Sequence, residues 1–218
     1  MAKDIAVLFD LDGTLIDSNE IIIESYVHAF KVFRPDLTLS RETVLTFIGP
    51  TLEMVFKEYV AADQINPMIE TYRAHYVENE AHHHHLYPGV IAGLVALKQL
   101  GAKLSIVTSK YKVAAWRSFT HYQLDTFFDA FVALDDVTEP KPNQEAVNVA
   151  LKRLGGADWA IMIGDNPGDI QAGLNAGIEG AGVAWSIKGK AFLQTFNPHA
   201  VFDSMEDIVT YVAAKMEA

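Results

Sequence analysis

The sequence contains no cysteine among its 218 residues. This absence excludes disulfide cross-links, thiolate metal sites and cysteine nucleophiles, and it fits a reducing compartment. Any metal ion that the protein binds must therefore be held by oxygen or nitrogen atoms.

Positive charge is scarce, since 17 Lys and Arg face 28 Asp and Glu, which gives a formal net charge of −11. A net-negative protein repels polyanions unless it carries a concentrated basic surface, and the sequence has no basic run. Long apolar runs are missing as well: the first apolar stretch is short and ends at Asp10, unlike a signal peptide or a membrane span. We therefore expect a cytoplasmic protein that binds neither nucleic acid nor membranes.

Hydrophobic residues make up 50% of the chain and charged residues 21%. This composition is typical of a folded globular protein and excludes a disordered chain. Short apolar runs rich in β-branched residues predict strands covered on both faces. The four clearest runs are Ile5–Phe9, Lys103–Val107, Trp159–Ile163 and Gly182–Trp185, and a weaker fifth is Ala130–Ala133. Helical patterns that end at Gly101 and Gly155 separate them, so we expect an α/β fold with a doubly wound parallel sheet.

A long segment between the first two predicted strands has the pattern of consecutive helices. It spans about ninety residues, several times the length of an ordinary crossover. Its helices are predicted to begin, in chain order, with a capping box from Asp17 to Glu20, at Ser40, at Thr51 and at Asn66-Pro67. We therefore expect residues 17–85 to form a helical cap domain, inserted into an α/β core of residues 1–16 and 86–218.

Two aspartates, Asp10 and Asp12, directly follow the first predicted strand. A simple turn would explain the neighbouring Gly13 but not the pair of carboxylates. Carboxylates two residues apart project to one side of an extended segment, and their repulsion is costly unless a cation relieves it. Because ligands of a doubly wound sheet bind beyond the carboxyl ends of its strands, Asp165 is expected to join them. The sequence therefore predicts a Mg²⁺ site formed by Asp10, Asp12 and Asp165.

Polar residues after the other predicted strands indicate an anion site beside this metal site. Lys141 lies between two prolines that stiffen its segment, and three acids require a fixed cation to hold an anionic substrate. Thr108 and Ser109 are expected to cap the next helix or to bind phosphate at its free N–H groups, and the two roles are compatible. Asp169 is interpreted either as a helix-capping residue or as the residue that orients Lys141 or a metal-bound water.

These segments resemble, in order and spacing, the motifs of the haloacid dehalogenase superfamily of aspartate-nucleophile phosphohydrolases. The matching positions are Asp10-x-Asp12-Gly-Thr, Thr108, Lys141 and Gly-Asp165-x-x-x-Asp169. The resemblance spans the whole chain and includes a helical cap inserted after the first motif. It implies that Asp10 attacks phosphorus to form an aspartyl-phosphate, and that Asp12 acts first as general acid and then as general base.

The resemblance also implies roles for the remaining positions. Mg²⁺ would be held by Asp10, the backbone carbonyl of Asp12 and Asp165, whereas Thr108 and Lys141 would bind the transferred phosphoryl group. The acid at position 12 separates this chain from the dehalogenases of the superfamily, which lack one there. We therefore expect a phosphatase-type hydrolase that acts on a small phosphate compound and needs no obligate protein partner.

Within the superfamily, the chain resembles the phosphoglycolate-phosphatase-like branch, and most of all the bacterial pyrophosphatases associated with HPr kinase/phosphorylase. The segments that carry this resemblance are residues 47–50, 134–137, 164–166 and 182–189. It implies hydrolysis of inorganic diphosphate, with Gly49 of the cap among the substrate-binding positions. A second phosphate requires further cations, and Lys110 and Lys188 are the candidates.

Other functions stay open on the sequence alone. A small phosphomonoester such as phosphoglycolate is the alternative substrate, a phosphomutase would transfer phosphate from a sugar bisphosphate, and the scaffold also suits a non-catalytic binding module. The run His82–His85 suggests a metal site, but consecutive residues point around a helix, so we expect a solvated helix end.

Overall fold

The computed structural model describes residues 3–217, apart from the side chains of residues 81–83. The chain divides into two compact units. The core unit comprises the residues up to Leu15 together with those from Leu86 onwards, and the inserted unit comprises Ile16–His85.

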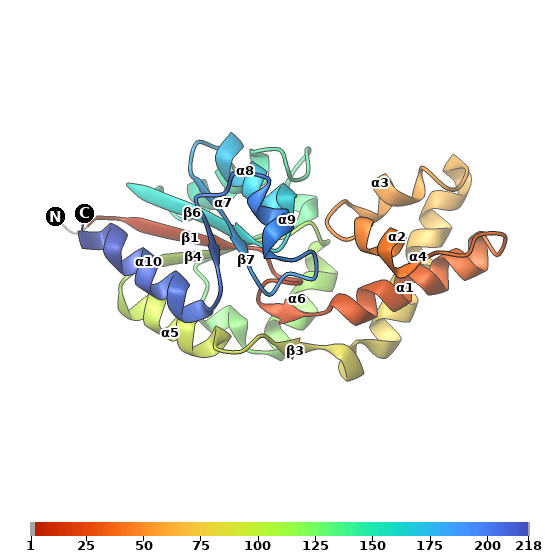
Figure 1. The fold of residues 1–218 in the computed structure, drawn as a ribbon, viewed down its shortest axis with the longest axis horizontal. Coiled ribbons are helices and arrows are strands. Elements are labelled where there is room, and N and C mark those ends of the chain that lie inside the picture. The colour runs from red at the N-terminus through yellow and green to blue at the C-terminus, as the bar shows by residue number, and fades with distance from the viewer. Residues whose placement is uncertain (1–2, 218) are drawn as a thin grey trace. The chain divides into compact units, whose positions relative to one another are not determined.

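The core unit is built on a six-stranded sheet with the order β5-β4-β1-β6-β7-β8, in which every neighbouring pair is parallel (Figure 1). The strands are β1 (Ile5–Phe9), β4 (Lys103–Val107), β5 (Ala130–Val132), β6 (Trp159–Gly164), β7 (Glu179–Val183) and β8 (Ala200–Phe202). Every residue of β1 is buried, as the continuous apolar pattern predicts for a central strand covered on both faces. The predicted α/β fold with a parallel sheet is thus confirmed.

Two strands at the β7 edge differ from the sequence prediction. The predicted strand Gly182–Trp185 begins earlier, at Glu179, and ends at Val183, so Trp185 lies in the following loop. The sequence pattern does not predict residues 179–181 as part of the strand, because β7 reads Glu-Gly-Ala-Gly-Val and has few large apolar side chains. The three-residue strand β8 was not predicted at all, because so short a run carries no readable periodicity.

Helices cover both faces of the sheet, with α5 and α10 on one side and α7 and α8 on the other (Figure 1). The helices of the core unit are α5 (Val90–Gln99), α6 (Lys112–His121), α7 (Glu145–Arg153), α8 (Pro167–Asn175), α9 (Lys190–Gln194) and α10 (Met205–Glu217), with short 3₁₀ turns at Leu124–Thr126 and Leu134–Asp136. Leu8, Val107, Val147 and Met162 belong to one buried apolar cluster, between the sheet and α7 and α8. This burial stabilises the layer against which the loops at the strand ends are held.

The register of the sheet aligns the carboxyl ends of its central strands. Phe9, the last residue of β1, pairs with Ile106 of β4 and with Ile163 of β6. The pairing continues one step further, because Asp10 N–H donates to Ile163 O at 2.9 Å and Thr108 N–H donates to Val132 O at 2.9 Å. Residues that follow β1, β4 and β6 therefore meet at one edge of the sheet.

The inserted unit is helical and contains α1 (Asn19–Phe33), α2 (Arg41–Thr46), α3 (Leu52–Phe56) and α4 (Ala62–His83). Its core is aromatic: the Tyr26 ring packs against Phe47, Phe56 and Tyr72 at centroid distances of 4.9–5.7 Å. The buried Tyr26 hydroxyl donates to Phe47 O at 3.1 Å, which fixes the segment before Gly49. These contacts bury the aromatic residues Phe56 and Tyr72 in the core of the inserted unit.

Two of the predicted helix starts in the inserted unit are confirmed. Ser40 accepts a hydrogen bond from Thr43 N–H, and Thr51 accepts one from Met54 N–H, each at 3.2 Å. Both are the N-cap bonds expected of a hydroxyl that precedes a helix.

Two other predicted helix starts are wrong. Asp17 Oδ1 accepts from the backbone and side-chain N–H groups of Asn19, so it closes a local turn, and α1 begins after Ser18 instead of with an Asp17 capping box. Helix α4 begins at Ala62 and contains Pro67 in its second turn. A proline there removes one intrahelical donor, but Asp63, whose carbonyl loses that partner, is exposed, so water can replace the bond.

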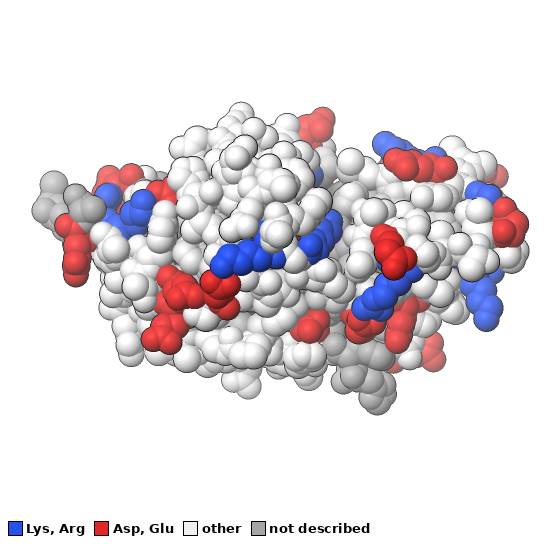
Figure 2. Space-filling model, in the orientation of Figure 1, with Lys and Arg blue, Asp and Glu red and all other residues white. Residues whose placement is uncertain are grey.

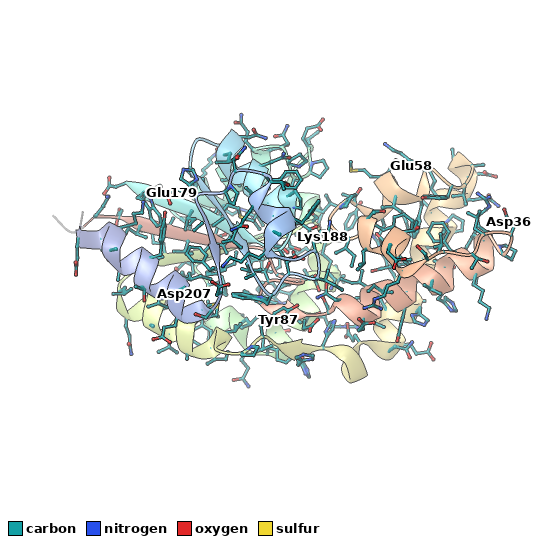
Figure 3. All side chains as sticks on the ribbon, viewed as in Figure 1. Asp36, Glu58, Tyr87, Glu179, Lys188 and Asp207 are labelled. Atoms are coloured by element: carbon teal, nitrogen blue, oxygen red, sulfur yellow. The ribbon has the colours of Figure 1, made fainter. Side chains whose placement is uncertain are left out.

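The chain passes between the units through two short strands, β2 (Ile16–Asp17) and β3 (His85–Leu86), which pair with each other. Beyond them, Tyr87 N–H donates to Leu15 O at 3.0 Å within the core unit; Tyr87 is labelled in Figure 3. The two connections therefore lie side by side where they enter the core unit.

Charges of both signs are mixed on the face seen in Figure 2, where acidic and basic groups alternate with broad uncharged areas. In the part of the chain that the structure describes, no helix has the length and apolar composition required to cross a bilayer. The longest, α4, carries charged residues along its length.

Candidate active site

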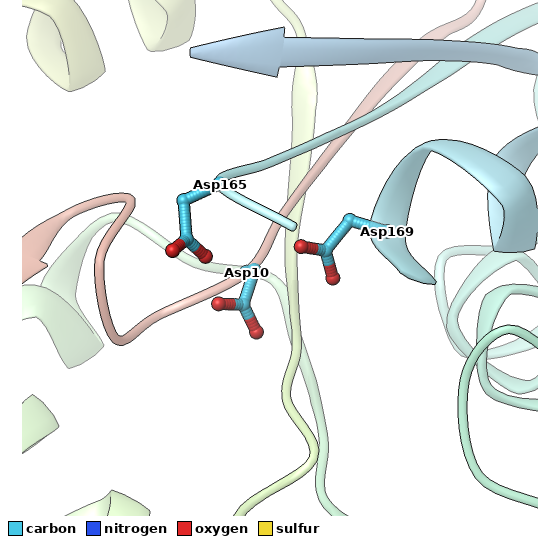
Figure 4. Close-up of side chains that lie close together, drawn as sticks. All are labelled: Asp10, Asp165 and Asp169. Carbon is cyan, nitrogen blue, oxygen red and sulfur yellow. The ribbon is translucent and has the colours of Figure 1, made fainter. Parts of the chain in front are cut away.

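Three buried carboxylates meet at the aligned strand ends. Asp10 follows β1, Asp165 follows β6, and Asp169 lies in the first turn of α8. Each offers one oxygen atom, and these three oxygens lie within 4.8 Å of one another (Figure 4). Like charges at this separation repel strongly in a buried setting, so the arrangement requires compensating positive charge.

Two glycines allow the carboxylates to approach the backbone this closely. Gly13 has φ +80, and a Cβ atom at this position would lie 2.4 Å from Asp165 Oδ2. A Cβ atom at Gly164 would lie 2.2 Å from the Asp169 carboxyl group. Both distances are far below van der Waals contact, so any side chain here would displace an acid of the site.

Lys141 supplies positive charge within the cluster. Its Nζ donates to Asp10 Oδ1 at 2.8 Å, to Asp169 Oδ1 at 2.5 Å and to Val107 O at 2.8 Å. The Lys141 side chain is only 6% exposed. A solvated loop lysine, the ordinary interpretation, does not fit this position; the flanking prolines belong to a segment that delivers a fixed ammonium group.

Asp169 combines the two interpretations that the sequence left open. Its Oδ2 accepts from Asn166 N–H at 3.0 Å at the start of α8, and its Oδ1 accepts from Lys141 Nζ. One carboxylate thus both satisfies a free N–H group of the helix and orients the lysine.

Burial and mutual repulsion shift the pKa values of these groups. Burial raises the pKa of Asp10 to about 7, although the Lys141 ammonium opposes the shift and Asp169 adds to it. Burial, together with repulsion from Asp10 and Asp169, raises the pKa of Asp165 well above its ordinary value. Burial would lower the pKa of Lys141, but the two carboxylates more than offset this and raise it. A single lysine therefore leaves the three acids incompletely compensated.

The donor set fits a divalent, oxygen-liking cation. Asp165 Oδ1 accepts from Asn166 Nδ2 at 2.9 Å, whereas the buried Asp165 Oδ2 has no hydrogen-bond partner among the described residues. A buried carboxylate oxygen without a partner is costly unless an ion binds it. Among the described residues, Asp10, Asp165 and Asp169 form the cluster that suits such an ion.

Asp12 lies outside this carboxylate cluster, and its Oδ1 accepts from Lys110 Nζ at 3.2 Å. The site that the structure assembles from side chains thus contains Asp169 where the sequence analysis placed Asp12. The expected contribution of Asp12 to Mg²⁺ binding is through its backbone carbonyl, and this role stays a prediction. Its partly exposed carboxyl group is separate from the buried trio, and its expected acid–base role stays a prediction.

The segment after β4 differs from the expected helix cap. Helix α6 begins at Lys112, whose N–H is bound by Asp135 Oδ1 at 2.8 Å. Thr108 Oγ1 instead accepts from Lys110 N–H at 3.2 Å, so it closes a tight turn before the helix. Capping of α6 by Thr108 is therefore wrong, because three residues lie between Thr108 and Lys112, the first residue of the helix. Phosphate binding by Thr108 and Ser109 stays a prediction.

Lys188 lies in the loop after β7, and the charges of Asp165 and Asp169 act on its side chain. Burial lowers its pKa, while Asp165 and Asp169 act in the opposite direction through their charge. Its backbone N–H donates to Ser186 Oγ at 3.1 Å, and Ser186 Oγ donates to Asp165 O at 2.7 Å. Ser186 was not among the predicted site residues, although it lies in the segment 182–189 that carries the resemblance and directly follows a predicted strand.

The remaining predicted positions lie in the inserted unit. Gly49 has φ +117, a conformation that favours glycine, and its substrate-binding role stays a prediction. The side chains of His82 and His83 lie outside the described residues. His84 Nε2 pairs with the Tyr76 hydroxyl at 2.5 Å, and the exposed His85 lies 3.5 Å from Asp17, so these two histidines have separate partners.

Comparison with known proteins gives one family. Residues 7–183 match the family model described as haloacid dehalogenase-like hydrolase. The chain is 41% identical to the pyrophosphatase PpaX of Halalkalibacterium halodurans over 213 residues, which cover 96% of this chain and 97% of the relative. It is 43% identical to the pyrophosphatase PpaX of Bacillus velezensis over 214 residues, with coverage of 96% and 97%.

Solved structures give the same result. A predicted phosphatase from Clostridium acetobutylicum is 28% identical, with a TM-score of 0.83 and coverage of 97% of this chain and 99% of that chain. A haloacid dehalogenase-like hydrolase from Streptococcus pneumoniae is 27% identical, with a TM-score of 0.81 and coverage of 95% and 97%.

Proposed function

Because the chain belongs to the haloacid dehalogenase-like hydrolases, we propose that it is a Mg²⁺-dependent phosphohydrolase that works through an aspartyl-phosphate on Asp10 and cleaves inorganic diphosphate. The enzyme class, hydrolase, follows from the family. The mechanism, the metal and the substrate are our proposal.

One observation carries the mechanism: Asp10 lies in a buried acidic site beside the fixed ammonium group of Lys141 and the unpartnered Oδ2 of Asp165. In the first step, a carboxylate oxygen of Asp10 forms a bond to phosphorus. The bond from phosphorus to the leaving oxygen breaks, and the Asp12 carboxyl group gives that oxygen its proton. In the second step, Asp12 takes a proton from water and the water oxygen attacks phosphorus. The bond between the Asp10 oxygen and phosphorus then breaks, which releases phosphate and restores the Asp10 carboxylate.

The other residues position the reacting groups and balance their charge. Lys141, held by Asp10 and Asp169, neutralises charge on the transferring phosphoryl group together with the Thr108 turn. Asp10, Asp165 and the backbone carbonyl of Asp12 would hold Mg²⁺, with Asp169 beside them. When bound, the ion supplies further stabilisation of negative charge on the phosphate oxygens.

Two observations support diphosphate as the substrate. Both curated relatives named above, at 41% and 43% identity over nearly their full length, are pyrophosphatases by name. In addition, Lys110 contacts Asp12 and Lys188 lies in the field of Asp165 and Asp169, so two cations besides Lys141 flank the acidic site. Diphosphate carries a second phosphate group where phosphoglycolate carries a carboxylate, and we assign these lysines to that second phosphate. We propose that this small-molecule reaction takes place in the cytoplasm without nucleic acid or an obligate protein partner.

The test is Mg²⁺-dependent phosphate release from diphosphate and from phosphoglycolate in parallel. We expect a higher kcat/KM for diphosphate and a loss of at least about a thousandfold in Asp10→Asn. A preference for phosphoglycolate would contradict the substrate, and full activity of Asp10→Asn would contradict the mechanism. Phosphate transfer from a sugar bisphosphate, without release, would indicate a mutase.

The lysines give a sharper test of the substrate. Lys110→Ala and Lys188→Ala are each expected to lower kcat/KM for diphosphate about tenfold, because a charge-assisted contact to the second phosphate is lost. The exposed Lys152 of α7 supplies the control variant, Lys152→Ala, with unchanged kinetics. If both site variants keep the wild-type kcat/KM for diphosphate, their assignment to the second phosphate is wrong.

A further inference from the structure

The loop between β7 and α9, residues 184–189, is anchored to the two loops that carry the acidic site. Trp185 Nε1 donates to Thr14 O at 3.0 Å, in the loop after β1. Ser186 Oγ donates to Asp165 O at 2.7 Å, in the loop after β6. Lys188, labelled in Figure 3, lies between these anchors and α9. The loop is therefore tied to the segments of Asp12 and Asp165 before the chain reaches Lys188.

The Ser186 hydroxyl joins an acid of the site to Lys188 through one oxygen atom. It donates to the backbone carbonyl of Asp165 and accepts from Lys188 N–H at 3.1 Å. Gly189 N–H also donates to Ser186 O at 3.0 Å, so the turn that presents Lys188 closes on this serine. Ser186 is 6% exposed, and water therefore has little access to replace the hydroxyl if it is removed.

The side chain of Lys188 is sensitive to this placement. It is half-buried, and the charges of Asp165 and Asp169 favour its ammonium form. A lysine side chain has many rotatable bonds, so a shift of its backbone changes how often Nζ reaches a given ligand atom. A fixed backbone at residue 188 therefore keeps the Lys188 Nζ within reach of the same ligand atom more of the time.

We propose that Ser186 is a positioning residue for the proposed reaction: its hydroxyl sets the backbone of Lys188 relative to Asp165 and thereby the affinity for a second phosphate. This inference rests on the proposed function, because it assigns Lys188 to the diphosphate substrate. It adds that the specificity for two linked phosphates depends on a hydroxyl that touches neither of them.

The experiment is a double-mutant cycle on binding, read by titration calorimetry with the full chain and saturating Mg²⁺. The probes are methylenediphosphonate, which carries two phosphorus groups, and methylphosphonate, which carries one. The ratio of their dissociation constants isolates the second group. Ser186→Ala is expected to weaken binding of methylenediphosphonate about tenfold relative to binding of methylphosphonate. Ser186→Thr, which keeps the hydroxyl, is expected to retain the wild-type ratio.

The decisive comparison is made in the Lys188→Met background. There we expect Ser186→Ala to leave the ratio unchanged, because the residue through which it acts is gone. An equal change of the ratio in both backgrounds, or none in either, would overturn the inference. Trp185→Phe removes the bond to Thr14 O and keeps an aromatic ring beside Tyr87, so it provides a second variant of the same loop if Ser186→Ala does not fold. Its effect on the ratio should also require Lys188.

These outcomes are distinguishable from failure of the proposed function. Binding of the diphosphonate does not require turnover, so the cycle gives a result even if the wild-type enzyme does not cleave diphosphate. Absence of diphosphate cleavage with intact coupling would refute the substrate, and cleavage with no coupling would refute the role of Ser186.

Discussion

At the scale of single residues, the site depends on the balance between three buried acids and one buried lysine. Lys141 contacts Asp10 and Asp169 but not the unpartnered Oδ2 of Asp165. Burial and repulsion accordingly raise the pKa values of Asp10 and Asp165. The folded protein therefore contains a local excess of negative charge that a bound divalent cation would relieve.

Magnesium is expected to stabilise the fold through this excess charge. Adding Mg²⁺ to the wild-type protein should raise Tm in proportion to RT ln(1 + [Mg²⁺]/Kd), because the ion binds the folded state. Asp165→Asn should remove most of this Mg²⁺-dependent rise, and its Tm without Mg²⁺ should be at least that of the wild type, since one buried charge is gone. Thermal unfolding with and without Mg²⁺ measures both. An undiminished rise in Asp165→Asn would show that the ion binds elsewhere.

Removing the ammonium group of Lys141 should destabilise the protein, in contrast to adding Mg²⁺. Lys141→Met leaves Asp10 and Asp169 without their cation, and breaking a buried ion pair from one side costs about 3 kcal/mol. The same change should lower kcat/KM about a hundredfold or more, because a fixed charge at the reacting group is lost. Urea unfolding and steady-state kinetics test both effects, with Lys152→Met on the surface of α7 as the control. Unfolding curves that coincide with the wild type would contradict the charge balance described here.

At the scale of elements, β7 is held so close to α8 that only glycine fits its second position. A Cβ atom at Gly180 would lie 2.3 Å from Ile170 O, a backbone atom of α8. Gly173 of α8 approaches the same strand, with a hypothetical Cβ 2.9 Å from Glu179 O. This packing sets where β7 ends, and hence where the loop with Ser186 and Lys188 begins.

The close packing predicts a large cost for one added methyl group. Gly180→Ala should destabilise the protein by about 3 kcal/mol, because the backbone of α8 or β7 must move. Gly155→Ala is the matched comparison: its φ is +80 but a Cβ there has no neighbour within 4 Å, so only conformational strain of about 1 kcal/mol is expected. Chemical denaturation of the two variants decides the order. A larger loss for Gly155→Ala would show that the contact with Ile170 is easily relaxed.

At the scale of the whole molecule, the acidic cluster and the hydrogen-bonded cluster around Glu179 lie at opposite ends of the sheet of the core unit. Asp10 and Asp165 follow the carboxyl ends of β1 and β6, whereas Glu179, labelled in Figure 3, lies at the start of β7. Its carboxylate accepts from Trp159 Nε1 of β6 at 2.9 Å, and from the Tyr211 hydroxyl and Lys215 Nζ of α10 at 2.8 and 2.6 Å. This end of the sheet is thereby linked to the C-terminal helix.

The Glu179 cluster predicts a pH dependence of stability. Burial favours a higher pKa for Glu179, but hydrogen bonds from Lys215, Trp159 and Tyr211 outweigh it and lower the pKa from the ordinary 4.5. A lowered carboxyl pKa contributes stability that is present above pH 4.5 and is lost as the pH falls through the lowered value. Glu179→Gln should therefore cost about 1–3 kcal/mol at pH 7 and progressively less below pH 4.5. Unfolding free energies of the wild type and Glu179→Gln, measured from pH 7 to below pH 4.5, test this expectation. Glu206→Gln, at an exposed position of α10, is the control. A difference between wild type and Glu179→Gln that does not change with pH would contradict the charge-based account.

The strands at the centre of the sheet and the residues that follow them were predictable from sequence, because they depend on local patterns. A continuous apolar run identifies β1, and the alignment of parallel strand ends predicts that Asp10 and Asp165 approach each other. Ser40 and Thr51 were predictable as caps for the same reason, since an N-cap bond spans only three residues. The resemblance of the motifs supplied the proposed roles of Asp10, Asp12 and Lys141, which the pattern of residues alone leaves open.

Only the tertiary structure decided which partner each charged group has. The bond from Lys141 to Asp169, the exclusion of the Asp12 carboxylate from the acidic trio, and the Ser186 link between Asp165 and Lys188 all join residues distant in sequence. The glycine-rich strand β7 and the start of α4 likewise depend on neighbours: Ile170 in the first case, and solvent around Asp63 in the second. Local periodicity records which face of an element is buried, but it does not record the distance to another element, and distance determines hydrogen bonds, repulsion and steric fit.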